Sequence, residues 1–131
     1  MSRRVVVTGM GALTPIGNNL NDYWESLKAG KSGAALITKF DTEKFKAKFA
    51  CELKGFNSLD HFDSKEVRKY DLFSQYALVA VEEAVQHAEI EFEKLNKDRI
   101  GVIWGSGNGG IQTFQDQMME FQKTNLSRSL Q

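Results

Sequence analysis

Two apolar runs, each leading into a glycine-rich turn, most constrain how this chain can fold. The first occupies residues 4–8 and stops at Gly9, and the second occupies residues 99–104 and is followed by four glycines within residues 105–110. Neither run alternates apolar with polar residues, which is typical of strands buried on both faces. Because helical segments follow each run, we predict an α/β fold with a mostly parallel buried sheet flanked by helices.

The segment between these runs begins with an amphipathic helix. Asn19 is a good N-cap with Asp22 three residues later, and Gly30 can supply the left-handed residue that ends the helix. Its apolar face comprises Leu20, Tyr23, Trp24 and Leu27. Residues 34–37 and 48–52 are predicted to form two further short strands.

The strongest helix signal runs from Asp63 to about Glu89. Asp63 and Glu66 have capping-box spacing, and small or aromatic residues then recur at steps of three and four. These are Tyr70, Phe73, Ala77, Ala80, Ala84 and Ala88. The alanines permit another element to approach closely, so this helix is predicted to be part of the core. A last helix presents Ile111, Phe114, Met118 and Phe121 on one side.

Composition excludes several classes of protein. The 131 residues are 41% hydrophobic and 26% charged, with 17 basic and 17 acidic side chains, so the chain is globular and not a strongly basic nucleic-acid binder. No apolar run approaches the roughly 18 residues of a membrane span. The N-terminal apolar run is too short for a secretory signal, and one cysteine cannot form an internal disulfide. We therefore expect a cytoplasmic chain that binds neither nucleic acid nor membrane.

The cysteine and the two histidines show no catalytic or metal-binding pattern. Nothing near Cys51 in sequence would lower its pKa, so we interpret it as a small buried hydrophobic residue. His61 and His87 lack the neighbouring ligands of a metal site and are interpreted as surface or helix-end residues. We expect no bound metal.

Gly105, Gly107 and Gly110 match the pattern G-x-G-x-x-G between a predicted strand and a predicted helix. This context suits a dinucleotide-binding turn, but the ribose-binding acid should lie about 20 residues further on. Residues 129–131 occupy that place and include no acid. The alternative is a turn that lets backbone pass close to a strand or a ligand, and on that interpretation we expect no cofactor. Titration with NAD(H), followed by Trp104 fluorescence, separates the two.

Lys65, Arg68 and Lys69 fall in the first two turns of the predicted long helix. The spacing i, i+3, i+4 places them on one face. A helix N-terminus is already positive, so cations there are disfavoured by about 0.3–1 kcal/mol each. We interpret the trio as an anion-receiving surface, with an ordinary solvated face as the alternative. Residues 1–69 also hold twelve basic and eight acidic side chains, whereas residues 70–131 hold five and nine.

The order of several segments resembles the β-ketoacyl-[acyl-carrier-protein] synthases, most closely the elongating enzymes of bacterial fatty acid synthesis. The matching segments are Arg4-Val5-Val6-Val7-Thr8-Gly9-Met10-Gly11-Ala12-Leu13-Thr14-Pro15-Ile16-Gly17-Asn18, residues 24–33, Phe40-Asp41, residues 65–71, and residues 99–110. The resemblance implies a thiolase-like fold, in which residues 1–131 form part of the N-terminal half-domain, and a homodimer when the protein is full length. It also implies a decarboxylating Claisen condensation of acyl- and malonyl-carrier protein, without a cofactor.

The same resemblance assigns two groups of residues. Lys65, Arg68 and Lys69 match positions that dock the acidic acyl carrier protein, and Gly107 and Asn108 match the lining of the acyl pocket. A polar amide at Asn108 is costly against an alkyl chain unless it is hydrogen-bonded. The family's nucleophilic cysteine, its two histidines and its lysine lie in later segments, so we assign no catalytic residue here. The alternative is a non-catalytic module that binds carrier protein or pairs with another chain.

We predict that the isolated 131-residue chain has no synthase activity, because the strand that carries the nucleophile is not among its matched segments. Incubation of the pure chain with acyl- and malonyl-carrier protein should yield no condensed product. Product formation by this chain alone would contradict the assignment.

Overall fold

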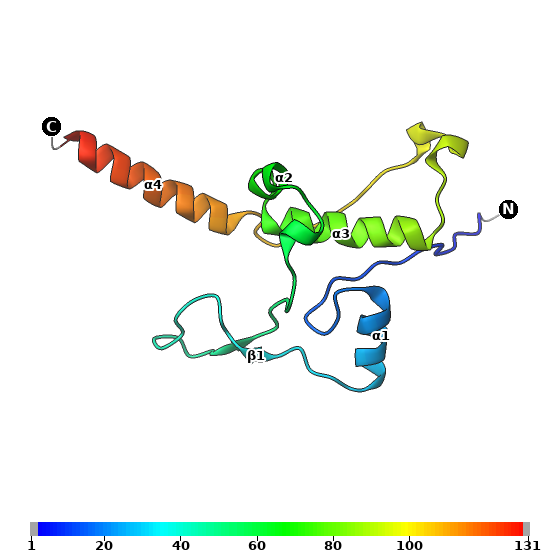
Figure 1. Ribbon diagram of the computed structural model, residues 1–131, viewed down its shortest axis with the longest axis horizontal. Coiled ribbons are helices and arrows are strands. Elements are labelled where there is room, and N and C mark those ends of the chain that lie inside the picture. Colours follow the sequence, from blue (N-terminus) through cyan, green and yellow to red (C-terminus); the bar gives the residue numbers. More distant parts are fainter. Residues whose placement is uncertain (1–2, 130–131) are drawn as a thin grey trace.

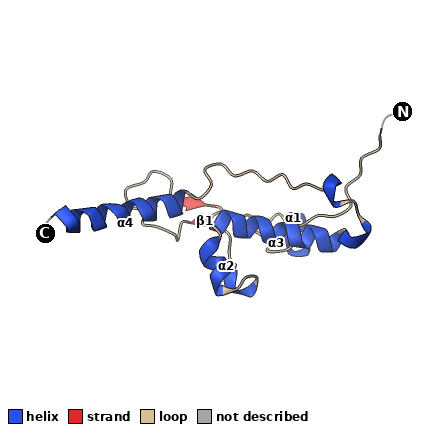
Figure 2. Ribbon diagram, turned by 90° about the horizontal axis from the view of Figure 1, so that it is seen from above, coloured by secondary structure: helices blue, strands red, loops and turns tan. Residues whose placement is uncertain are grey.

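Helix α3 is joined by hydrogen bonds to the N-terminal segment, α1 and α2 in the computed structural model, which describes residues 3–129 (Figure 1). The elements are α1 (Leu20–Lys28), β1 (Ala35–Leu36), β2 (Phe49–Ala50), α2 (Ser64–Lys69), α3 (Leu72–His87) and α4 (Ile111–Ser129), with 3-10 turns at Ser58–Asp60, Phe92–Lys94 and Lys97–Arg99. Helix α2 sits at the start of α3, and α4 projects away from that same end in both views (Figure 2). The described helices include none that is long and apolar enough to cross a membrane.

Helix α1 forms as its sequence predicts. The Asn19 side chain accepts a hydrogen bond of 2.8 Å from the Asp22 backbone N–H, and its amide donates to the Asp22 carboxylate. Gly30 follows the helix with φ of +63°, the left-handed conformation that glycine adopts without steric cost. The predicted apolar residues of α1 line a hollow together with Met10 and His87.

The alanine face of α3 is covered by the N-terminal segment, as the alanine spacing predicts. Gly9 lies against Ala84 and Ala88, and Gly11 lies against Ala80 and Ala84, so closely that a Cβ on either glycine would overlap the backbone of α3. Small residues on both sides allow this approach, which brings the two backbones into van der Waals contact.

Polar contacts reinforce this attachment. The two carboxylate oxygens of Glu83 accept hydrogen bonds from the backbone N–H groups of Ala12, at 2.8 Å, and Leu20, at 2.7 Å. His87, at the end of α3, accepts a bond of 3.1 Å from the Met10 N–H through Nδ1. Glu83 thereby joins the N-terminal segment and the first turn of α1 to one side chain of α3.

Strands β1 and β2 form an antiparallel pair in which Ala35 faces Ala50 and Leu36 faces Phe49. Glu52 lies beyond β2 and accepts bonds from the hydroxyl and the backbone N–H of Thr38, and these bonds lower the pKa of its carboxyl. The two predicted short strands are therefore confirmed, although each is shorter than expected. Cys51 directly follows β2 and is exposed, so its interpretation as a buried residue is wrong.

The two long apolar runs do not form strands in the described residues. Arg99 ends the 3-10 turn Lys97–Arg99, and residues 4–8 and 100–104 pair with no strand in the described chain. Val5 and Ile103 expose 91% and 101% of their surface. A strand needs neighbours to satisfy its backbone N–H and C=O groups, and residues 3–129 place no strand beside either run. The described sheet is antiparallel, so the predicted mostly parallel sheet is not confirmed by it. A dinucleotide-binding turn at residues 105–110 would require an acid near residues 129–131. Of these, residues 130–131 lie outside the described residues.

The long helix predicted from Asp63 to Glu89 is wrong in one respect, because it is broken in two. Tyr70 has φ of −102° and ψ of 128°, which ends α2, and Asp71 is the N-cap residue from which α3 begins. The Asp71 side chain caps no N–H of α3 and accepts a hydrogen bond from the Thr113 hydroxyl instead. The break could not be predicted from the spacing of apolar residues, because that spacing continues from Tyr70 into α3.

Helix α4 presents its predicted apolar residues without a covering element. Ile111, Phe114, Met118 and Phe121 expose between 44% and 66% of their surface. Within the described chain, α4 attaches to the rest at its first turn, where the Thr113 hydroxyl donates a hydrogen bond to the Asp71 carboxylate. The helix is therefore correctly predicted, whereas burial of its apolar side is not seen.

Substitution of Gly11 by alanine should destabilise this chain by about 1–3 kcal/mol, because the new methyl group overlaps the Ala80 carbonyl oxygen. Chemical denaturation followed by circular dichroism measures the change. The control is Gly101→Ala, where a Cβ would meet nothing within 4 Å. Equal stability of the two variants would show that the close contact is not formed.

Candidate functional site

The three cations predicted to bind an anionic partner all lie on α2. Lys65, Arg68 and Lys69 are exposed, and their spacing places them on one face of this helix. In residues 3–129 the ion pairs are Glu25–Lys28 and Glu91–Lys94, so the trio is not neutralised by a neighbouring carboxylate. Three such charges can receive an acidic surface or a phosphate group.

The start of α2 is fixed by the capping box that the sequence predicts. One oxygen of the Asp63 carboxylate accepts bonds from the N–H groups of Lys65, at 2.7 Å, and Glu66, at 2.8 Å. The Glu66 carboxylate accepts in return from the Asp63 N–H at 3.2 Å. Both acids therefore serve the helix start, and their side chains are oriented towards backbone groups.

The end of α2 changes the electrostatic argument for the trio. Because the helix stops at Lys69, both Arg68 and Lys69 lie in its last turn, where the helix dipole favours positive charge. The predicted conflict with the dipole is therefore wrong for these two residues and is confined to Lys65, which has Asp63 and Glu66 beside it. The exposure and common face of the trio remain as the evidence for a binding surface.

A residue that the sequence analysis missed holds this end of α2. Gln75 of α3 is 3% exposed, and its Nε2 donates to the carbonyl oxygens of Tyr70, at 2.8 Å, and Val67, at 3.2 Å. The available signal was a single polar residue among the alanines and aromatic residues of α3. A buried polar side chain of this kind usually forms hydrogen bonds, because burying an amide without a hydrogen-bond partner costs free energy.

The glycine-rich segment, residues 105–110, ends next to the junction of α2 and α3. Gly110 lies directly against the Asp71 carboxylate, which also accepts the bond from Thr113. Gly107 and Asn108 are exposed, and the Ser106 hydroxyl accepts a bond of 3.1 Å from the Gly109 N–H. The structure therefore brings the end of residues 105–110 to the junction of α2 and α3, while Gly107 and Asn108 themselves face solvent.

An apolar hollow of about 570 Å³ lies along α3 near this junction. Its wall comprises Tyr70, Phe73, Ser74, Ala77, Leu78, Val81, Val102 and Trp104. Trp104 also lines an adjoining hollow with Tyr76, and burial raises the pKa of the Tyr76 phenol. A lining of this kind suits hydrocarbon and offers no group for acid–base chemistry near neutral pH.

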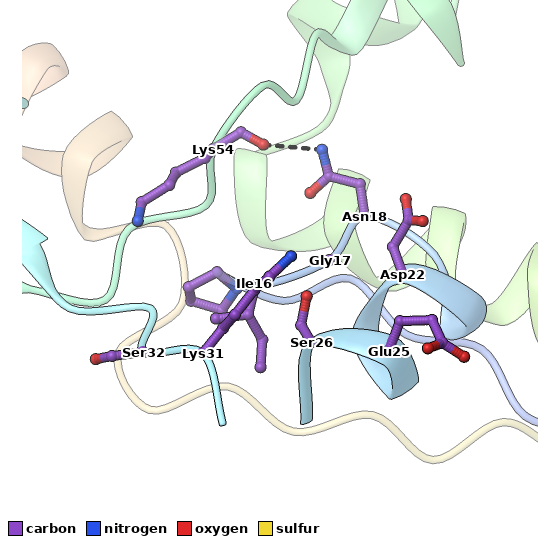
Figure 3. Close-up of a pocket in the computed structure, with 10 residues that line it drawn as sticks. Ile16, Gly17, Asn18, Asp22, Glu25, Ser26, Lys31, Ser32 and Lys54 are labelled. Carbon is purple, nitrogen blue, oxygen red and sulfur yellow. Dashed lines mark hydrogen bonds between the residues drawn. The ribbon is translucent and has the colours of Figure 1, made fainter. Parts of the chain in front are cut away.

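A polar hollow of about 430 Å³ lies between the start of α1 and residues 31–32 (Figure 3). Lys31 and Lys54 contribute positive charge, Asp22 and Glu25 contribute negative charge, and Asn18 donates a bond of 2.8 Å to the Lys54 carbonyl oxygen. The opposite charges balance, so this hollow does not select a ligand by the sign of its charge.

In the part of the chain that the structure describes, the remaining reactive side chains do not form a catalytic cluster. Cys51 is exposed, His61 stacks on Phe56 with ring centres 5.3 Å apart, and His87 is bonded to Met10. The described residues contain no group of three or more His, Cys, Asp or Glu side chains close enough together to bind a metal ion. The interpretation of His61 and His87 as surface and helix-end residues is confirmed.

Comparison with known proteins identifies the class to which these features belong. The family described as Beta-ketoacyl synthase, N-terminal domain, matches residues 2–130, so the chain belongs to this family. Two proteins called 3-oxoacyl-[acyl-carrier-protein] synthase 2 are similar to it: that of Staphylococcus aureus (strain COL) is 50% identical over 114 residues, and that of Synechocystis sp. is 43% identical over 115. These matches cover 87% and 88% of this chain but only 28% of each relative.

Solved structures give the same result for the fold. The ishigamide ketosynthase/chain length factor matches 90% of this chain and 30% of its own, with a TM-score of 0.69 and 32% sequence identity. A second match is a chain from the structure described as a type II PKS acyl-carrier protein in complex with its ketosynthase bound to the hexaketide. The match covers 73% of this chain and 25% of that chain, with a TM-score of 0.53 and 29% sequence identity. The thiolase-like ketosynthase fold expected from the sequence is therefore shown at the level of the family.

Substitution of Asp63 by alanine removes the acceptor for two N–H groups and should destabilise α2 by about 1 kcal/mol. Amide hydrogen exchange of residues 64–70 should accelerate roughly fivefold as a result. The control is Asp60→Ala, whose carboxylate contacts the Asn57 side chain and caps no helix. Unchanged exchange in the Asp63 variant would show that the capping box does not hold α2.

Proposed function

We propose that this chain belongs to a 3-oxoacyl-[acyl-carrier-protein] synthase of fatty acid biosynthesis and carries its docking surface for acyl carrier protein. The observation that supports docking most directly is the trio on α2, which presents three exposed, unneutralised cations on one helical face. The names of the similar proteins supply the reaction, and one similar ketosynthase is described in complex with an acyl-carrier protein.

The proposed reaction is a decarboxylating Claisen condensation. An acyl group passes from carrier protein to an enzyme cysteine with release of the carrier thiol. Malonyl-carrier protein then loses CO2, and the electron pair of the broken carbon–carbon bond forms the carbanion that attacks the acyl thioester. The enzyme thiolate leaves, and 3-oxoacyl-carrier protein is the product. Dividing acyl transfer from bond formation in this way is covalent catalysis.

Residues 1–131 contribute binding to this reaction, and none of them is assigned a catalytic role. Long-range attraction between the trio and an acidic carrier protein raises the rate of encounter and orients the carrier. We further propose that Gly107 and Asn108 line the acyl pocket in the complete enzyme. The contact of Gly110 with Asp71 supports this placement, because it sets the glycine-rich segment beside the helix junction that follows the docking face.

The complete protein is proposed to be a cytoplasmic homodimer that requires no cofactor. In it, residues 1–131 form part of the N-terminal half-domain, and residues 4–8 and 99–104 are strands of a mostly parallel, buried sheet. The exposed valines and Trp104 support this arrangement, because such apolar runs are stable only when both faces are covered. The same exposure argues against an autonomous binding module, since a stable monomer rarely exposes so much apolar surface.

Charge reversal tests the docking proposal. In the intact synthase, replacement of Lys65, Arg68 and Lys69 by glutamate should raise KM for acyl-carrier protein about 10- to 100-fold, because attraction becomes repulsion. Steady-state kinetics at several salt concentrations should show a salt dependence that is flattened or reversed.

The matched control replaces Lys44, Lys46 and Lys48 by glutamate. These lysines are also exposed, and the change in net charge is the same. If both triple variants behave alike, the effect is one of overall charge, and the assignment of docking to α2 is overturned.

A further inference from the structure

We infer that Gln75 is a positioning residue for carrier protein, whose side-chain amide holds α2 at a fixed angle to α3. The inference rests on the proposed docking function of the trio. Gln75 is on a different helix from the three cations, and its hydrogen-bond partners are backbone groups of the segment that carries them, the carbonyl oxygens of Val67 and Tyr70.

Helix α2 requires such support because it has only six residues. Helices shorter than about 12 residues are marginal in water, since one turn must form before hydrogen bonds accumulate. The capping box holds the N-terminal end, but the carbonyl groups of the last turn have no partner within the helix. Arg68 and Lys69 lie in this turn, so its order decides where two of the three charges point.

The Gln75 amide is placed to supply the missing partners. Its Nε2 lies 2.8 Å from the Tyr70 oxygen and 3.2 Å from the Val67 oxygen, so one NH2 group donates to carbonyls on both sides of the helix end. The side chain is 3% exposed, which shields these bonds from water. Its Oε1 has no hydrogen-bond partner in the described chain. The hydrogen bonds of the Gln75 side chain are therefore those donated by its NH2 group.

The consequence concerns affinity for the partner. If the last turn is already ordered, carrier protein binds without the entropy cost of ordering the backbone that carries Arg68 and Lys69. If the last turn of α2 is disordered, Arg68 and Lys69 keep their charges, but the positions of these charges relative to each other vary. Loss of the Gln75 contacts should therefore weaken carrier binding while the charge of the docking face stays the same.

The variant Gln75→Glu tests this in the intact synthase, because the side chain has the same shape as the amide but loses its donors: an ionised carboxylate donates to neither carbonyl, and a protonated one donates to only one of them. We expect KM for acyl-carrier protein to rise about tenfold, the effect of exchanging a buried hydrogen bond for repulsion. The kcat value should be unchanged, as should KM for a small acyl-N-acetylcysteamine thioester that bypasses the docking face. The matched control is Gln86→Glu, an exposed position on the same helix with the same change of charge.

Two results would overturn the inference: equal carrier KM in the Gln75 and Gln86 variants, or a parallel rise in KM for the small thioester. If charge reversal of the trio also leaves carrier KM unchanged, the docking proposal itself has failed. If that reversal acts and Gln75→Glu does not, only the role of Gln75 is refuted.

A measurement on the unmodified synthase decides the case where Gln75→Glu does not fold. Hydrogen exchange of residues 64–70 should be slow before carrier protein is added and change less than twofold on binding, because α2 is already ordered. Rapid exchange that slows only in the complex would show that carrier protein orders the helix, and would refute the inference.

Discussion

The close contact between the N-terminal glycines and the alanine face of α3 is the interaction on which the described structure depends. It joins a segment near the beginning of the chain to a helix about seventy residues later, and Glu83 then connects α1 to the same helix. Any side chain on Gly9 or Gly11 would separate the backbones. The position of α3 in turn determines where α2 lies, because Gln75 near its start donates hydrogen bonds to the carbonyl groups of Val67 and Tyr70 at the end of α2.

The proposed docking face is thus positioned by hydrogen bonds to the backbone at both ends of a short helix. Asp63 and Glu66 hold the start, Gln75 holds the end, and the three cations occupy positions that these contacts leave exposed. The carboxylates of Asp63 and Glu66 keep their charge, but they are directed towards N–H groups of the helix start. Neither forms an ion pair with Lys65, Arg68 or Lys69 in the described residues.

Local features of this fold were predictable from the sequence, whereas features that need distant partners were not. The cap at Asn19, the left-handed Gly30 and the Asp63–Glu66 box follow from spacing within a few residues. The break at Tyr70 did not follow, because apolar periodicity continues through it and the side chain that stabilises it comes from the next helix. Exposure of Cys51 was likewise hidden, since the strand before it pairs along only two residues. The trio was found from spacing, but its relation to the helix dipole depended on the unforeseen break.

The unpaired runs at residues 4–8 and 100–104 have a consequence for how such a protein is made. During synthesis the first run emerges from the ribosome long before any sheet neighbour that lies later in the chain. Until that neighbour arrives, its bare backbone edge and valine side chains can pair with the same segment of another nascent molecule. Folding that must wait for distant contacts is slow, so this stretch is where molecular chaperones would have the most to shield.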